Sequence, residues 1–109
     1  MKPVIILTAT ATKNAAKRIA NYLIKQQCAA CVNIVQNYES VYIWEGKIQN
    51  ESECLLQIKT DKSLIRKIES YFNESHPYDL PELIVVDIID GSPEYLDWMS
   101  KSMKVTPNV

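Results

Sequence analysis

Cysteine and histidine are the side chains of this sequence best suited to soft-metal or redox chemistry, and it contains three of the former and one of the latter. Cys28 and Cys31 are separated by two alanines, a spacing at which two thiolates can share a metal ion or form a short disulfide. The pair follows a predicted helix, however, and the dipole at a helix C-terminus disfavours a thiolate. A structural zinc site also needs two further ligands, and there is no second such pair. Packing in the core or at a sheet edge is therefore the favoured interpretation, and a free thiol is the alternative.

His76 is the only histidine, so one chain cannot build a two-histidine metal centre. It stands between a predicted helix and Pro77, where a histidine can bond a free helix carbonyl. The alternative is a ligand role, because in a symmetric oligomer His76 of one chain can meet Cys31 or other groups of another. Thiolate together with imidazole favours copper or zinc over magnesium or calcium.

Motifs for enzymatic catalysis are missing from the sequence. It has no nucleophile motif and no paired catalytic carboxylates, and with only Gly46 and Gly91 it cannot form a glycine-rich phosphate loop. Asp87 lies in an apolar segment and could be an acid with a perturbed pKa. The favoured alternative is that it faces a bridging lysine, such as Lys59, or the rim of an oligomer. We therefore expect a protein that is not an enzyme.

Length and charge restrict the possible partners further. A chain of 109 residues with 47% hydrophobic residues predicts one globular domain over residues 1–109, with a frayed tail after about residue 104. The net charge of −1 and the scattered lysines predict no nucleic-acid partner and no attraction to a membrane surface. An odd number of cysteines, and an N-terminal apolar stretch shorter than a signal-peptide core, predict a cytoplasmic protein with reduced thiols.

The elements that must position these residues follow from hydrophobic periodicity and turn signals. We predict strands at residues 4–7, 31–44, 53–60 and 83–89, helices at residues 14–27 and from the cap at Thr60 or Asp61 to a point before His76, and a short helix after residues 91–93. The strands at 31–44 and 53–60 form a long hairpin around a turn at 45–47. This order predicts an α+β fold, a ferredoxin-like βαββαβ sandwich with an antiparallel sheet and an extra C-terminal helix.

One face of this sheet lacks a cover in a single chain. Right-handed crossovers place both main helices on the same side of the sheet. The strands at residues 4–7 and 83–89 nevertheless carry aliphatic side chains on both faces, and so does the segment 40–44. An exposed apolar patch of this kind marks an interaction site. We expect an oligomer, and the alternative is a monomer whose terminal helix folds over the sheet.

Several segments of the sequence strongly resemble the CutA divalent-cation tolerance family. They are residues 29–34 (AACVNI), 40–48 (SVYIWEGKI), 53–60 (ECLLQIKT), 76–82 (HPYDLPE) and 91–98 (GSPEYLDW). The resemblance implies a ferredoxin-like subunit in a homotrimer, similar in assembly to the nitrogen-regulatory signalling trimers. It also implies a role in tolerance or response to copper and other divalent metal ions.

The resemblance points to metal-binding residues and to a second function. Cys31 and His76 match positions proposed to bind copper(II) in family members. Thr8 and Ser75 stand where some members carry a cysteine and a second histidine, so the implied copper binding is weak, and Cys28 does not match a family ligand. The alternative function is a trimeric small-ligand sensor or interaction scaffold. Its inter-subunit clefts would lie near four residues, Trp44, Lys59, Tyr78 and Glu82.

Overall fold

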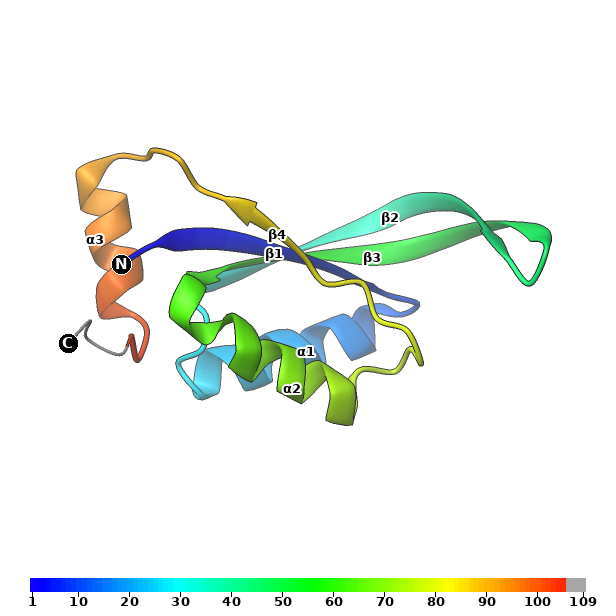
Figure 1. The fold of residues 1–109 in the computed structure, drawn as a ribbon, viewed down its shortest axis with the longest axis horizontal. Coiled ribbons are helices and arrows are strands. Elements are labelled where there is room, and N and C mark those ends of the chain that lie inside the picture. The colour runs from blue at the N-terminus through cyan, green and yellow to red at the C-terminus, as the bar shows by residue number, and fades with distance from the viewer. Residues whose placement is uncertain (106–109) are drawn as a thin grey trace.

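A four-stranded antiparallel sheet, with the strand order β2-β3-β1-β4, forms the frame of the computed structural model (Figure 1), which describes residues 1–105. Helices α1 and α2 cover one face of the sheet, and α3 lies at one end of it. This arrangement confirms the predicted ferredoxin-like fold with an extra helix. The elements are β1 (Pro3–Thr10), α1 (Lys13–Lys25), β2 (Cys31–Trp44), β3 (Lys47–Asp61), the 3-10 turn η1 (Lys62–Leu64), α2 (Ile65–Ser75), β4 (Ile84–Asp87) and α3 (Pro93–Lys101).

Three strand boundaries differ from the prediction. β1 extends to Thr10, and β3 begins at Lys47 because its polar residues 49–51 pair with residues 40–42 across the hairpin. Polar residues such as these are typical of a loop in a single sequence, but the ladder needs only backbone groups. β4 is shorter than residues 83–89, since its pairing with β1 covers only residues 84–87. The predicted frayed tail lies, from residue 106 onward, outside the described residues.

The first helix also ends earlier than predicted, and the reason is a left-handed residue. Gln27 has φ +56°, and Cys28 N–H donates to the Leu23 carbonyl at 2.9 Å, which is the pattern of a Schellman motif. This turn carries Cys28 into the core, where the side chain is buried. The predicted cap at Asp61 belongs to η1, the 3-10 turn that leads into α2: Asp61 accepts a hydrogen bond from Ser63 N–H at 2.9 Å, and α2 itself begins after Leu64 without a side-chain cap.

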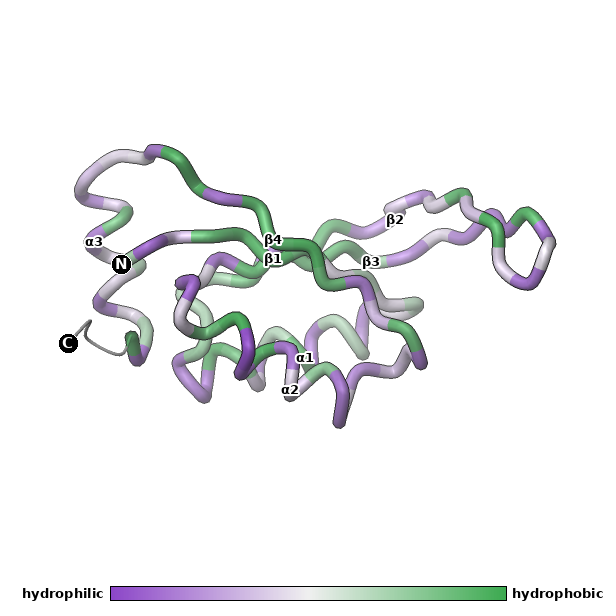
Figure 2. Tube along the Cα trace, in the orientation of Figure 1, coloured by the Kyte–Doolittle hydropathy of each residue, from purple (hydrophilic) through white to green (hydrophobic). Residues whose placement is uncertain are grey.

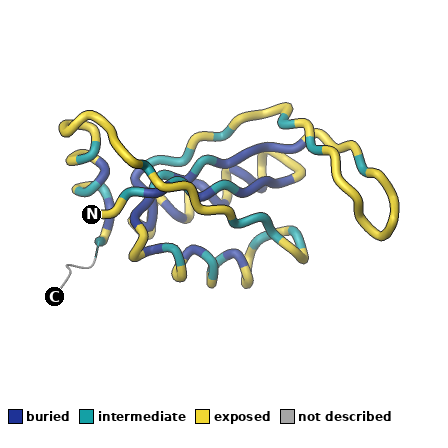
Figure 3. Tube along the Cα trace, turned by 45° about the horizontal axis from the view of Figure 1, so that its top comes forward, coloured by how far each residue is buried: buried dark blue, intermediate teal, exposed yellow. Residues whose placement is uncertain are grey.

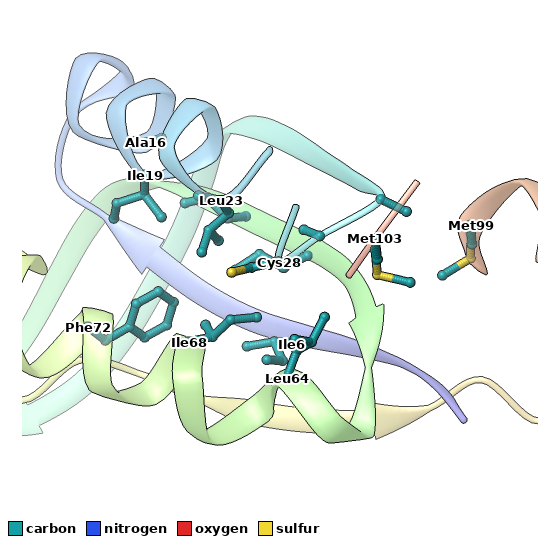
Figure 4. Close-up of a cluster of buried hydrophobic side chains, with 14 of the residues drawn as sticks. Ile6, Ala16, Ile19, Leu23, Cys28, Leu64, Ile68, Phe72, Met99 and Met103 are labelled. Carbon is teal, nitrogen blue, oxygen red and sulfur yellow. The ribbon is translucent and has the colours of Figure 1, made fainter. Parts of the chain in front are cut away.

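The core lies between the sheet and the two main helices (Figure 4). Ile6 on β1 and Ile58 on β3 face each other in the ladder and are fully buried. The helices contribute apolar side chains that are also buried: Ala16, Ile19, Leu23, Ile68 and Phe72. Met99 and Met103 extend the cluster toward α3, so the terminal helix is fixed to one end of the sandwich. No helix among residues 1–105 is long and apolar enough to span a membrane.

The β2–β3 hairpin projects well beyond the rest of the molecule (Figure 1). The whole molecule, hairpin included, measures 47 × 28 × 23 Å. Glu45 and Gly46 form its tip with φ +51° and +76°, the combination of a type I′ turn. A bulge between Val35 and Tyr38 inserts an extra residue into β2, and Asn37 there has φ +57°. After the bulge, the side chains of Tyr42 and Trp44 therefore lie on the face opposite to α1 and α2.

Much of that face, and of the hairpin, has no cover in one chain (Figure 3). Ile84 and Val86 on β4 are about half exposed, and the hairpin side chains Val41, Ile43 and Ile48 are 67%, 70% and 73% exposed. Figure 2 shows hydrophobic stretches along β1 and β4 as well as near the hairpin tip. α3 reaches the uncovered face only at one end, through Tyr95. The alternative of a monomer whose terminal helix covers the face therefore does not describe this structure.

Candidate functional site

A cleft lies where the hairpin passes the connection between α2 and β4. It has a volume of about 610 Å³. The hairpin provides Tyr42, Trp44, Gln49, Glu51 and Glu53, the connection provides Pro77, Tyr78, Asp79, Leu80 and Glu82, and β1 provides Ala9. Three of the four predicted cleft residues, Trp44, Tyr78 and Glu82, thus share one cavity within a single chain.

The ladder register explains how the hairpin side chains reach this cleft. Tyr38 pairs with Glu53 and Tyr42 pairs with Gln49, so these side chains share one face of the hairpin with Glu51. Without the bulge, Tyr42 and Trp44 would point to the opposite face, because side chains alternate along a strand. The bulge therefore assembles the aromatic and acidic side chains of the cleft.

A partly buried hydrogen bond fixes one wall of the cleft to the other. The Tyr78 hydroxyl donates to Glu53 Oε2 at 2.6 Å, and Glu53 is only 8% exposed. Burial, together with the neighbouring Glu53 carboxylate, raises the pKa of Tyr78 far above its ordinary value, so the hydroxyl keeps its proton and remains a donor. This contact ties residues 77–82 to β3.

The electrostatics of the cleft are one-sided. Four carboxylates line it, from Glu51, Glu53, Asp79 and Glu82, and no lysine or arginine does. Within residues 1–105, none of the four forms an ion pair. Burial, and then repulsion from Glu53, raises the pKa of Glu82 above its ordinary value. A bound cation would relieve this repulsion.

His76 lies next to this cleft as the residue that ends α2. Its imidazole Nδ1 accepts a hydrogen bond from Tyr78 N–H at 3.1 Å, and Nε2 lies 3.0 Å from Thr8 Oγ1. Burial lowers the pKa of His76, and this outweighs the opposing effect of a hydrogen bond with the Ala9 backbone. The ring is therefore neutral at pH 7, and its one free lone pair is used by Tyr78. Through these two hydrogen bonds, His76 fixes the start of the segment 77–82 to β1.

The second predicted metal ligand, Cys31, lies away from His76 in one chain. Cys31 pairs with Lys59, which pairs with Ile5, whereas His76 contacts β1 three residues further on at Thr8. Two strand spacings and three residues along a strand separate the backbone of Cys31 from that of Thr8, the residue that His76 contacts, by about 14 Å. Within residues 1–105, no group of three or more His, Cys, Asp and Glu side chains could hold a metal ion. One chain therefore does not bring the predicted copper ligands together.

The cysteines are free thiols. Cys28 and Cys54 are buried, while Cys31 is partly exposed at the start of β2. Burial raises the pKa of the Cys28 thiol, which opposes the thiolate that redox or metal chemistry requires. These positions agree with the packing interpretation of Cys28, and they leave Cys31 as the accessible sulfur.

Two charged residues differ from their predicted surroundings. Lys59 does not line the cleft, because its Nζ lies 3.2 Å from the Tyr95 hydroxyl and 5.3 Å from the centre of that ring, at the α3 end of the sheet. Asp87 pairs with Lys62 at 3.5 Å instead of with Lys59, and both side chains are well exposed.

Sequence reasoning missed most of the acidic lining. Glu51 and Glu53 alternate on one strand in the same way as Tyr42 and Trp44 do on the other, and this matched alternation is the signal that could have found them. The bulge that sets the two patterns on one face has no comparable sequence signal.

Comparison with known proteins supplies the family context. The model of the family described as "CutA1 divalent ion tolerance protein" matches residues 4–102. The chain is 43% identical over 101 residues to "Protein CutA, chloroplastic" of Arabidopsis thaliana, covering 93% of this chain and 56% of that protein. It is 37% identical over 101 residues to "Divalent-cation tolerance protein CutA" of Pectobacterium atrosepticum, covering 93% and 92%.

Solved structures agree with the sequence matches. The crystal structure of CutA1 from Oryza sativa superposes with a TM-score of 0.93 at 40% identity and covers 97% of both chains. The structure of the divalent cation tolerance protein from Thermus thermophilus gives 0.88 at 34% identity, covering 93% of this chain and 98% of that one. The chain spans just over half the length of the chloroplast relatives that it matches.

Proposed function

The chain belongs to the CutA1 divalent ion tolerance family, and from this premise we propose that it acts as a cytoplasmic homotrimer in tolerance or response to divalent metal ions. The family match over residues 4–102 is the observation that carries this proposal. The role is not enzymatic, in keeping with relatives that are named tolerance proteins.

The homotrimer is supported by the apolar surface that one chain leaves open. The outer strands of the sheet are β2 and β4, whose outer edges have backbone groups without a strand partner in one chain. Exposed Ile43 and Ile48 stand on the projecting hairpin, and exposed Ile84 stands on β4. Association of identical subunits through the hairpin would cover the exposed apolar side chains and would also pair the open strand edges. Both effects favour the assembly.

Copper(II) is the metal that we propose, with weak binding through His76 and Cys31. The residues of one chain do not fit a tight copper site, because the two donors lie apart and Nδ1 of His76 accepts from Tyr78 N–H. Cys31 supplies the accessible sulfur donor, and His76 supplies a nitrogen only when that hydrogen bond is given up. Few ligands and a competing hydrogen bond both lower affinity.

Titration of copper(II) and zinc into the purified protein tests the metal proposal. We expect weak copper binding that weakens further in His76→Ala and in Cys31→Ser. Asn73→Ala and Gln36→Ala serve as matched controls, because each changes an exposed side chain on the same element as, or next to, a predicted ligand without removing that ligand. Copper binding that is unchanged in both His76→Ala and Cys31→Ser would show that the named ligands are wrong.

Growth of the source cells with and without the gene, at increasing copper(II), tests the tolerance role separately. We expect that cells without the gene stop growing at a lower copper concentration, and that the intact gene restores growth. Equal growth curves would contradict the role even if the purified protein binds copper.

A small-ligand sensor is the second candidate function, and the cleft favours it. A cavity of about 610 Å³ is in the size range of small-molecule sites, and three of its lining residues are aromatic. This function does not require that His76 or Cys31 bind a metal.

A further inference from the structure

We propose that Tyr22 and Tyr71 form a site of oxidative modification, at which the two rings couple into a dityrosine cross-link between α1 and α2. The oxidant is hydrogen peroxide, activated by a one-electron catalyst such as a haem peroxidase. This inference depends neither on metal binding nor on the number of subunits. It rests on the stacking of the two rings, on their exposure and on their place in the fold.

The two rings lie face to face where α1 and α2 meet. Their centroids are 4.0 Å apart, and their planes are inclined by 12°. In a phenoxyl radical, the unpaired electron occupies orbitals perpendicular to the ring, with density at the carbons ortho to the oxygen. Two such radicals form a carbon–carbon bond when their faces meet. The fold therefore holds the pair in the orientation that coupling requires, which makes the reaction effectively unimolecular.

One molecule of peroxide accounts for one cross-link. Each phenol loses one electron and one proton, and the two phenoxyl radicals join through an ortho carbon of each ring. The hydrogens on these two carbons then move to the oxygens, which restores both aromatic rings and both hydroxyl groups. Overall, the tyrosine pair loses two hydrogen atoms, and these reduce hydrogen peroxide to two molecules of water.

The pair is accessible to a catalyst from solvent. Tyr22 is 41% exposed, and Tyr71 is partly exposed beside it. Burial raises the pKa of Tyr71, so this side chain begins as a neutral phenol that must release its proton together with the electron. The nearby Arg18 guanidinium acts in the opposite direction and favours this release.

The pair also lies on the side of the molecule that the proposed assembly leaves free. α1 and α2 cover one face of the sheet (Figure 1), whereas the apolar surface proposed for subunit contacts lies on the hairpin and on β4. Both rings belong to one chain, so the cross-link forms within a subunit. It closes a loop that contains β2 and β3, and such a closed loop stabilises a fold by restricting the unfolded chain.

Coupling within one chain is specific to these two rings. Among the described residues, no other pair of tyrosine rings is in contact, because each remaining aromatic pair contains a ring of another type. Tyr95 is exposed to the same extent as Tyr22, at 41%, but its neighbour is Trp98. Tyr95 therefore matches Tyr22 in access and lacks a tyrosine partner.

Treatment of the purified protein with hydrogen peroxide and a haem peroxidase tests the proposal. After digestion with trypsin, mass spectrometry should find the peptides 19–25 and 68–101 joined, with a mass two hydrogens below their sum. Fragmentation should place the bond at Tyr22 and Tyr71. On a reducing denaturing gel, the cross-linked product should migrate as a single chain and show dityrosine fluorescence.

Phenylalanine variants identify the two rings. Tyr22→Phe and Tyr71→Phe each keep a ring in the stack but cannot form the phenoxyl radical at that position. Each variant should therefore lose the joined peptides and the fluorescence of the single-chain band. Tyr95→Phe is the matched control, because it removes an equally exposed tyrosine outside the pair, and it should retain both signals.

Three results would overturn the proposal. One is the absence of joined peptides when the same mixture oxidises free tyrosine to dityrosine. Another is dityrosine that occurs only in bands heavier than one chain, since this means coupling between chains. The third is a single-chain cross-link that persists in Tyr22→Phe or is lost in Tyr95→Phe. If circular dichroism shows that Tyr22→Phe does not fold, Tyr71→Phe replaces it with the same expected loss, and a cross-link that persists in Tyr71→Phe overturns the proposal.

Discussion

Tyr78 connects the two features of this chain that bear on function. Its backbone N–H donates to His76 Nδ1, and its hydroxyl donates to Glu53. His76 in turn lies 3.0 Å from Thr8, so a continuous series of hydrogen bonds runs from β1 through the histidine to the floor of the acidic cleft. A change at any of these residues should therefore alter the position of the side chains that line the cleft.

Replacement of Tyr78 by phenylalanine should destabilise the fold. The change leaves the buried Glu53 carboxylate without its donor, and an unsatisfied buried polar group costs about 1–3 kcal/mol. Urea denaturation at a fixed protein concentration measures the effect, because assembly links stability to concentration. Tyr38→Phe is the control, since Tyr38 pairs with Glu53 in the ladder but its hydroxyl forms no hydrogen bond among residues 1–105. Equal stability of Tyr78→Phe and the unchanged protein would contradict this role.

Asp61 should make the protein sensitive to acid. Burial alone would raise the pKa of Asp61, but hydrogen bonds from Ser63 and from Lys2 N–H together lower it. A carboxyl whose folded-state pKa is lowered stabilises the fold fully above its unfolded pKa of about 3.9, and this contribution is lost as the pH falls through the lower folded value.

The variant Asp61→Asn removes this titration. We expect a loss of about 1–2 kcal/mol at pH 7, because the cap and the charged hydrogen bonds are weakened. Below about pH 4 the difference from the unchanged protein should shrink, because Asp61 is then protonated first in the unfolded state and, at lower pH, in the folded state as well. Urea denaturation between pH 7 and pH 2.5 measures both effects, and a difference that stays constant over this range would contradict the assignment.

At the residue scale, sequence reasoning found part of the site. Trp44, Tyr78 and Glu82 were predicted to share a cleft and do line one cavity. Lys59 was placed there too, but it lies beside Tyr95, because pairing with Ile5 carries it toward the other end of the sheet. The inter-subunit nature of the cleft remains a prediction.

At the scale of elements, the hairpin decides what the cleft contains. Its bulge near Asn37 turns Tyr42 and Trp44 to the face that also carries Glu51, and its length carries them past the end of β1 to residues 77–82. The order of all strands and helices could be predicted from periodicity. The bulge and the full length of β3 could not, because polar residues in a ladder look like a loop in a single sequence.

The hairpin tip offers a test of its turn type. Glu45 has φ +51°, a conformation that asparagine tolerates better than glutamate, and Asn-Gly is the preferred pair for a type I′ turn. Glu45→Asn should therefore stabilise the protein by up to about 1 kcal/mol. Urea denaturation measures the change against Lys47→Asn, which places asparagine in the adjoining strand and should give no gain. A loss of stability in Glu45→Asn would contradict the turn assignment.

At the scale of the whole molecule, one chain leaves an apolar surface that two helices and a terminal helix cannot cover. The exposed hairpin residues Ile43 and Ile48 lie on the face of the hairpin opposite to Tyr42 and Trp44, whereas the exposed Ile84 lies on the same sheet face as Tyr42 and Trp44. Sequence patterning predicted the uncovered surface, and the family resemblance implies three subunits, a number that stays a prediction.

The double variant Ile43→Lys with Ile48→Lys should weaken the assembly. Two buried charges at an apolar contact are costly, so dissociation should occur at a protein concentration at least tenfold higher than for the unchanged protein. Sedimentation velocity over a dilution series measures this shift. Ile24→Lys is the matched control, because Ile24 is also an exposed isoleucine, at 43%, but lies on α1. The same dissociation in both variants would place the contact elsewhere.

The molar mass of the unchanged protein in solution tests most directly the claim that three copies complete this fold. Light scattering on a sizing column at micromolar concentration gives that mass without a standard. Three chains of 12.5 kDa predict a mass of about 37.5 kDa. A single species of 12.5 kDa would show that one chain is complete without a partner, and it would contradict the account.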